Sequence, residues 1–211
     1  MPFLRPEKIA ARFRNGSECG FSLLELFITM ILILILASMM IGRGMFIDDN
    51  KVHISCQKNL QNIYLALSIY SADNKGIFPV LPGAETSEPP LSLLVPRSTT
   101  VTEPFICPAS GDKKLPEGES FAKRTISYAY YMGRLKGDGA EAALVSDRQV
   151  NTFPKIKRQL IFSETGKEPG ANHSKSGGNV LFCDGSFKKV NVRASRDYLF
   201  PTNVVLLNPR P

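Results

Sequence analysis

The residues best suited to chemistry in this chain are its four cysteines and two histidines. Thiolates and imidazoles bind transition metals, and they also act as nucleophiles and general bases. Their arrangement in the sequence supports neither use. No two cysteines are spaced C-x-x-C, no G-x-S-x-G motif occurs, and only His53 and His173 are available for a metal cage or a catalytic triad. We therefore expect no zinc site and no enzymatic activity, and we expect His173 to be a hydrogen-bonding residue of a loop.

The element that dominates the chain is an apolar run from Leu26 to Gly42 that contains no charged residue. A helix over 21–41 would be about 30 Å long, which matches the hydrocarbon thickness of a bilayer. Lysine and arginine concentrate on the cytoplasmic side of a membrane span. The basic side chains that precede this run are Arg5, Lys8, Arg12 and Arg14. We predict a single membrane span with the N-terminus inside and the residues beyond about 47 exported.

The order of the N-terminal features differs from that of a secretory signal peptide. A signal peptide has a shorter apolar region followed by a small-x-small cleavage site, and a site near Ala37 would here fall inside the apolar run. Cys19 precedes this run, which also argues against a lipoprotein. In addition, Glu25 lies near the start of the run, and a carboxylate in apolar surroundings implies a cationic partner.

The stretch KIAARFRNGSECGFSLLELFITMILILIL resembles the class III leader of type IV pilins and type II secretion pseudopilins. The resemblance implies that a prepilin peptidase cuts the bond between Gly20 and Phe21 and that the new N-terminus at Phe21 is methylated. It also implies that Glu25 pairs with the terminal amine of a neighbouring subunit during filament assembly. Residues four apart share one helix face, so Phe21 and Glu25 lie on the same face of the predicted helix.

Further segments resemble a major-pseudopilin-like branch of the same family. They are CQKNLQNIYLALSIYSADNKGIFP at 56–79, FICP at 105–108, SYAYY at 127–131 and HSKSGGNVLFCDG at 173–185. Major pseudopilins commonly hold a calcium ion in a C-terminal loop, and Asp184 with Asp147 or Glu164 would imitate that loop here. No D-x-[DN]-x-[DN]-G spacing occurs in the chain. The expectation of a bound calcium ion therefore depends on the resemblance alone. We expect no other metal or cofactor.

The sequence after the apolar run predicts that the helix continues with an amphipathic half. Its apolar positions have helical spacing and are Val52, Cys56, Leu60, Ile63, Leu67 and Tyr70. Asn74-Lys75-Gly76 predicts the end of the helix near Asp73. The run 76–120, rich in proline, glycine, serine and threonine, predicts loops.

Strands are predicted where β-branched and aromatic residues cluster between turn residues. These runs are 125–132, 158–164, 178–183 and 186–192. The last two flank Asp184-Gly185, a pair favoured in tight turns, which predicts a hairpin over 179–192.

The expected fold class is therefore α+β and pilin-like. In it, one long N-terminal helix with a transmembrane half and an amphipathic half packs on a small antiparallel β-sheet. The expected organisation is a cleaved cytoplasmic leader over 1–20, a transmembrane and assembly helix over 21–75, and an exported globular domain over 76–211.

Removal of the leader would leave three cysteines, Cys56, Cys107 and Cys183. An oxidising compartment would allow one disulfide, and we expect Cys107 to pair with Cys183 or with Cys56. Buried free thiols are an equally acceptable interpretation of these residues.

The net charge of +7 is spread along the 211 residues without a block of like charges. This pattern favours a solvated surface, and we expect no nucleic-acid partner.

The resemblance implies a structural subunit of a type II secretion pseudopilus or related filament. It would be a single-pass protein of the bacterial inner membrane, with its C-terminal domain in the periplasm or at the cell surface. The implied partners are further copies of the chain, the prepilin peptidase and methyltransferase, other pseudopilins and the inner-membrane assembly platform. The alternatives are a minor pilin for adhesion or DNA uptake, and a membrane-anchored binding domain that does not polymerise.

Overall fold

The computed structural model describes residues 22–150, 158–194 and 204–211, and it leaves the side chains of 40–50 undescribed. The predicted processing site, Gly20 and Phe21, lies outside the described residues. The chain divides into two compact units, Met1–Phe46 and Ile47–Pro211.

The described part of the first unit is helical. Helix α1 (Leu23–Asp73) begins in this unit, and its first turn contains Glu25. A negative charge in the first turn of a helix interacts favourably with the helix dipole. The large apolar side chains from Leu23 to Met39 are exposed, as is Glu25.

The predicted fold class is wrong in its transmembrane half. A span requires about 20 predominantly apolar residues in succession. Among the side chains described in the first unit, Glu25 and Thr29 interrupt the apolar series. In the part of the chain that the structure describes, no helix combines the length and the apolar character needed to cross a membrane. The observed elements are instead α1, three short helical segments and an antiparallel sheet.

In the second unit, α1 buries its predicted apolar stripe. The central positions of this stripe are confirmed as buried residues: Cys56, Leu60, Ile63 and Leu67. The predicted end of the helix at Asp73 is also confirmed. Beyond it, Gly76 takes a φ of +81° that favours glycine, and its N–H donates a hydrogen bond to the carbonyl of Ser71 at 2.7 Å.

Within the described residues, the second unit contains one five-stranded sheet with strand order β4-β3-β2-β1-β5. Its strands are β1 (Tyr128–Met132), β2 (Ala143–Asp147), β3 (Gly178–Phe182), β4 (Phe187–Val190) and β5 (Val205–Leu207). All neighbouring strands are antiparallel. The predicted hairpin is confirmed, because β3 and β4 pair around the turn at Asp184-Gly185. The outer strand β4 exposes Phe187, Lys188 and Lys189.

The strand predictions fail at three places. The run 158–164 forms no strand, although Ile161 and Phe162 are buried. Strands β2 and β5 were not predicted, because each is short and β2 ends in Ser146 and Asp147, which are poor strand formers. Both strands are positioned by their pairing with β1. A local sequence pattern gives no information about such pairing between distant segments.

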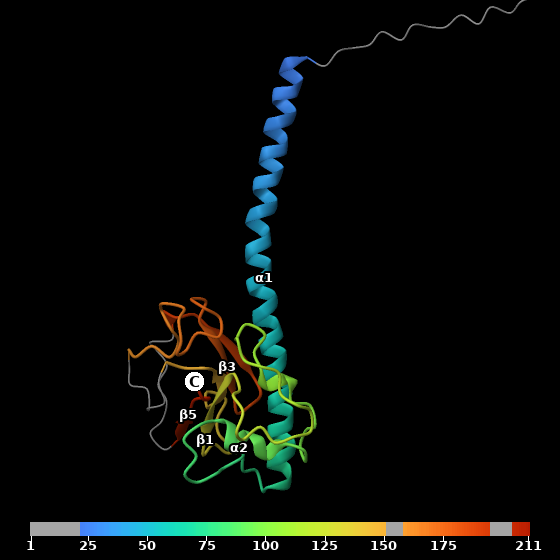
Figure 1. The fold of residues 1–211 in the computed structure, drawn as a ribbon. Coiled ribbons are helices and arrows are strands. Elements are labelled where there is room, and N and C mark those ends of the chain that lie inside the picture. Colours follow the sequence, from blue (N-terminus) through green and yellow to red (C-terminus); the bar gives the residue numbers. More distant parts are fainter. Residues whose placement is uncertain (1–21, 151–157, 195–203) are drawn as a thin grey trace, which may run out of the picture. The chain divides into compact units, whose positions relative to one another are not determined.

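The central strands β1, β2 and β3 are buried on both faces of the sheet. Tyr128 and Tyr130 of β1 belong to a core cluster that includes the stripe of α1, whereas Ala129 and Tyr131 belong to a second cluster with Phe162. This division follows the alternation of side chains along a strand. Figure 1 shows the second half of α1 beside the sheet, within the second unit. The short segments α2 (Glu88–Leu91), η1 (Ser92–Leu94) and η2 (Glu103–Phe105) add side chains to the first cluster.

Candidate metal centre

Four side chains that can bind a metal ion meet at one place in the second unit: Cys56, Cys107, Asp147 and His173. One ligand atom from each residue lies within 4.8 Å of the other three. All four residues are buried. They come from α1, from the segment after η2, from the end of β2 and from the segment before β3. The cluster therefore joins four parts of the chain that are far apart in sequence.

Hydrogen bonds fix the segment of Cys107 against α1, which carries Cys56. The backbone N–H of Cys107 donates to Oγ of Ser127 at 2.8 Å. One residue earlier, the carbonyl of Ile106 accepts a hydrogen bond from Nδ2 of Asn59 at 2.9 Å. Asn59 lies less than one helical turn beyond Cys56 on α1, so this bond fixes the segment of Cys107 against the helix. Hydrogen bonding to Cys56 and burial raise the pKa of the Cys107 thiol above its usual range.

Asp147 accepts several hydrogen bonds although only 1% of its surface is exposed. Its Oδ2 accepts from the backbone N–H of Asn179 at 2.6 Å and from Nδ2 of the same residue at 3.1 Å. Its Oδ1 accepts from Nδ2 of Asn172 at 3.0 Å. These bonds fix the orientation of the carboxylate, with Oδ2 directed at His173.

Gly178, at the start of β3, permits the close approach of Asp147 to this strand. A Cβ atom at residue 178 would lie 2.6 Å from the ring of Phe162 and 3.0 Å from Cβ of Asp147. Both neighbours are buried and have little room to move. Only glycine therefore fits at this position without displacing the sheet or the carboxylate.

Replacing Gly178 by Ala is expected to lower the free energy of unfolding by about 1–3 kcal/mol, the usual cost of overpacking a dense core. Chemical denaturation followed by circular dichroism measures this loss. Gly139 is the matched control, because a Cβ atom there would meet no atom within 4 Å. Equal stability of the Gly178→Ala and Gly139→Ala variants would contradict the packing described for β3.

His173 places one ring nitrogen against three polar atoms. Its Nε2 lies 3.2 Å from Oδ2 of Asp147, 3.6 Å from Sγ of Cys107 and 3.4 Å from Nδ2 of Asn179. A nitrogen of this kind either donates one proton or accepts at one lone pair, so it cannot serve all three neighbours by hydrogen bonding. Burial lowers the pKa of His173, but the hydrogen bonds to Asp147 and Cys107 outweigh it and raise the pKa to about 10.

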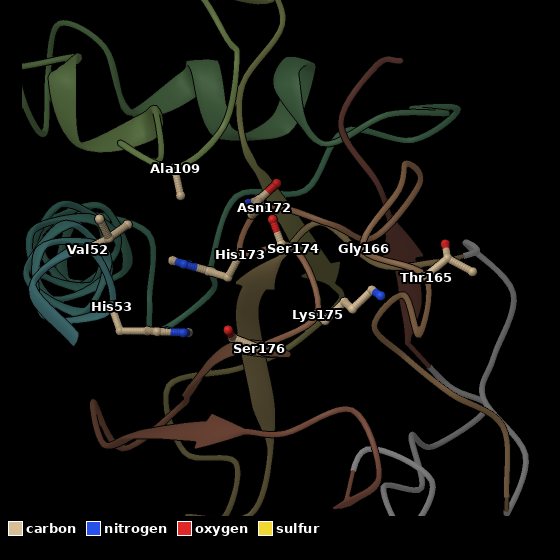
Figure 2. A pocket seen from close by; sticks show the side chains of 10 residues that line it. All are labelled: Val52, His53, Ala109, Thr165, Gly166, Asn172, His173, Ser174, Lys175 and Ser176. Carbon is tan, nitrogen blue, oxygen red and sulfur yellow. The ribbon is translucent and has the colours of Figure 1, made fainter. Parts of the chain in front are cut away.

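His53, on α1, stacks against His173. Their ring centroids are 4.0 Å apart and the ring planes differ by 14°. His53 is 3% exposed, and within the described residues neither of its ring nitrogens has a hydrogen-bond partner. Burial, with the neighbouring positive charges of His173 and Lys189, lowers the pKa of His53 to about 4. Figure 2 shows His173 pointing toward α1 and both histidines at the wall of a pocket. His173 thus belongs to both the pocket and the cluster.

The side chains of the cluster offer two thiols, one imidazole and one carboxylate. Four protein ligands complete a tetrahedral coordination shell, whereas a catalytic metal site keeps one position open for water or substrate. The arrangement therefore suits a structural metal site better than a hydrolytic one.

The residues predicted to bind calcium are not brought together. Asp147 contacts Asn179 at the start of β3, whereas Asp184 lies in the turn after the other end of β3 and is exposed. Oδ1 of Asp184 accepts hydrogen bonds from the backbone N–H and the hydroxyl of Ser186, which lower the pKa of Asp184. Glu164 is exposed as well.

The three predicted disulfide cysteines are free thiols and all are buried. Cys56 and Cys107 share the cluster, but Cys183 does not belong to it. Cys183 lies just after β3, where its carbonyl accepts a hydrogen bond from the hydroxyl of Tyr64 at 3.2 Å. Cys56 is thus the candidate partner that lies beside Cys107, and a disulfide between them stays a prediction.

The cluster was missed from the sequence because its four residues have no local spacing. A partial signal was present, since Cys56 lies on the predicted buried stripe and Cys107 follows the apolar pair Phe105-Ile106. Nothing in the sequence indicated that Asp147 and His173 lie beside them. The position of Asp147 in the cluster is set by the pairing of β2 with β3.

Comparison of the chain with protein families, with curated proteins and with solved structures gives no match.

Proposed function

We propose that this protein is a structural, non-enzymatic subunit of a type II secretion pseudopilus or a related type IV pilus-like filament. In this proposal a prepilin peptidase removes residues 1–20 at the bacterial inner membrane, and the chain then assembles through the N-terminal half of α1. The leader motif around Gly20 and Phe21 gives the resemblance on which the proposal depends.

The observation that carries the proposal is the exposed apolar surface of α1. Its large side chains between Leu23 and Met39 have exposed fractions of 46% to 72% in the single chain. A large exposed apolar surface on a helix favours association with another surface that covers it. Copies of the same helix offer a surface of matching chemistry, and a bundle of such helices would bury these side chains together.

Glu25 has a specific role in this proposal. Cleavage after Gly20 would create a positive α-amino group at Phe21, and the carboxylate of Glu25 lies about one helical turn away along the chain. Pairing of this carboxylate with the amine of a neighbouring copy would fix the register of otherwise similar apolar helices, as buried polar residues do in coiled coils.

Processing is tested by expressing the full-length chain in a bacterium that contains a prepilin peptidase and a filament assembly platform. N-terminal sequencing and mass spectrometry of the recovered protein are expected to show methylated Phe21 as the first residue. A chain that retains Met1, or that starts beyond residue 37, would sink the proposed processing.

Replacing Glu25 by Ala is expected to reduce recovery of the chain in the sheared filament fraction by more than about tenfold, because loss of one partner of a buried charge pair costs about 3–5 kcal/mol. Processing at Gly20 should continue. Thr29→Ala is the matched control, since Thr29 is exposed one turn further along α1 and its hydroxyl bonds only the carbonyl of Leu26 among the described contacts. Normal filament incorporation of Glu25→Ala would favour a binding domain that does not polymerise.

A further inference from the structure

We propose that Cys56, Cys107, Asp147 and His173 together bind one zinc ion, which fastens α1 to the sheet of the second unit. The chemistry of the ligand set selects the metal. Calcium and magnesium prefer oxygen ligands, whereas thiolate sulfur is a preferred ligand of zinc. Zinc also accepts imidazole nitrogen and carboxylate oxygen, and four protein ligands are typical of its structural sites.

The distances in the cluster match a tetrahedral zinc shell. Zinc bonds of about 2.3 Å to sulfur and about 2.0–2.2 Å to nitrogen or oxygen place two ligands of one ion about 3.3–3.8 Å apart. Nε2 of His173 lies 3.2 Å from Oδ2 of Asp147 and 3.6 Å from Sγ of Cys107. All four ligand atoms lie within 4.8 Å of one another, so closure around an ion requires only small side-chain movements.

The unusual surroundings of His173 support the same assignment. Its Nε2 faces an oxygen, a sulfur and an amide nitrogen, and no single hydrogen bond satisfies them. A zinc ion between these groups would take the lone pair of Nε2 and contact the oxygen and the sulfur at the same time. Asn172 and Asn179 would then hold the carboxylate of Asp147 from outside the coordination shell, as partners of metal ligands commonly do.

Metal binding would release protons in a balanced way. Each thiol of Cys56 and Cys107 gives up its proton and becomes a thiolate, and the imidazolium of His173 gives up its proton as well and binds as the neutral imidazole. The Asp147 carboxylate contributes its negative charge without losing a proton. No oxidant or reductant takes part in this step.

The role of the ion follows from the origin of its ligands. It would connect α1, the segment after η2, the end of β2 and the segment before β3. Because such a site does not exist in the unfolded chain, the free energy of zinc binding contributes to folding. This inference is independent of the filament proposal, since all four ligands lie in the unit Ile47–Pro211.

The test uses the full-length chain, purified in a mild detergent that covers its exposed apolar helix, under reducing conditions. Elemental analysis of protein grown with zinc is expected to give about one zinc ion per chain. Replacement of zinc by Co²⁺ is expected to give the visible absorption of a tetrahedral site and a thiolate charge-transfer band. The cobalt spectrum of the wild-type chain counts thiolate ligands without any substitution, so the test does not depend on the folding of a variant.

Variants identify the ligands. Cys107→Ser and His173→Gln are each expected to weaken zinc binding more than tenfold, measured by competition with a chelating dye. Cys183→Ser is the matched control, because Cys183 is also a buried free thiol of the first core cluster but lies outside the ligand set. It should bind zinc as the wild-type chain does.

Removal of zinc by a strong chelator is expected to lower the melting temperature by about 10 °C, the shift expected when a ligand far above its dissociation constant is lost. Added zinc should restore it, and added calcium should not. Three outcomes would overturn the proposal: no zinc in the wild-type chain, equal loss of zinc in Cys183→Ser and Cys107→Ser, or a Cys56–Cys107 disulfide in protein prepared with zinc and without reductant.

Discussion

Replacing Leu60 by Ala is expected to lower the free energy of unfolding by about 2–5 kcal/mol, the cost of removing a leucine side chain from a dense core. Leu60 is fully buried on the stripe of α1 and belongs to the core cluster that includes Tyr128 and Tyr130 of β1. Urea denaturation measures this loss. Because the chain has no tryptophan and six tyrosines, tyrosine near-ultraviolet circular dichroism is a suitable signal.

Leu65→Ala provides the control for Leu60→Ala on the same helix. Leu65 is 61% exposed, so its replacement should change the free energy of unfolding by no more than about 0.5 kcal/mol. The two substitutions remove the same atoms and have the same effect on helix propensity. Similar losses at both positions would therefore contradict the packing of α1 against the sheet.

Replacing Arg148 by Ala is expected to destabilise the second unit by about 3–5 kcal/mol, because it leaves a largely buried carboxylate without its cation. Nη2 of Arg148 donates to Asp112 at 3.2 Å and to the carbonyl of Ile126 at 3.0 Å. The side chains of Arg148 and Asp112 are only 5% and 11% exposed. Asp112 also accepts a hydrogen bond from Ser127, which holds Cys107, so the loss should extend to the segment that carries this cysteine.

The same denaturation experiment with Arg97→Ala controls for the removal of a positive charge, since Arg97 is exposed. A second variant, Arg148→Met with Asp112→Asn, removes both charges and should recover much of the lost stability. If Arg148→Ala were no less stable than Arg97→Ala, the ion pair with Asp112 would have no structural role.

The elements that the sequence predicts correctly are those with strong local signals. The spacing of Leu60, Ile63 and Leu67 predicts the buried face of α1, and Asp184-Gly185 predicts the β3–β4 hairpin. Each depends on residues that are close together in the chain. The prediction of a transmembrane half of α1 is wrong, because a long apolar run alone does not establish a span and no helix of the described residues has the length and apolar character of one.

The remaining features depend on contacts between distant residues. Strand β2 lies between β1 and β3 and is buried along its whole length, so its short sequence needs no alternation of apolar and polar residues. The ligand cluster has the same origin. The sequence predicts a buried position for Cys56 and a loop position for His173, but only the order of the strands places Asp147 beside them.

The exposed lysines of the outer strand β4 affect how copies of the protein associate at high concentration. The outer strand of a sheet can add a strand from another chain, which leads to aggregation. Lys188 and Lys189 are exposed along β4, and a second copy laid antiparallel against it would bring like charges together. This repulsion disfavours the addition of a second copy of the chain at the β4 edge.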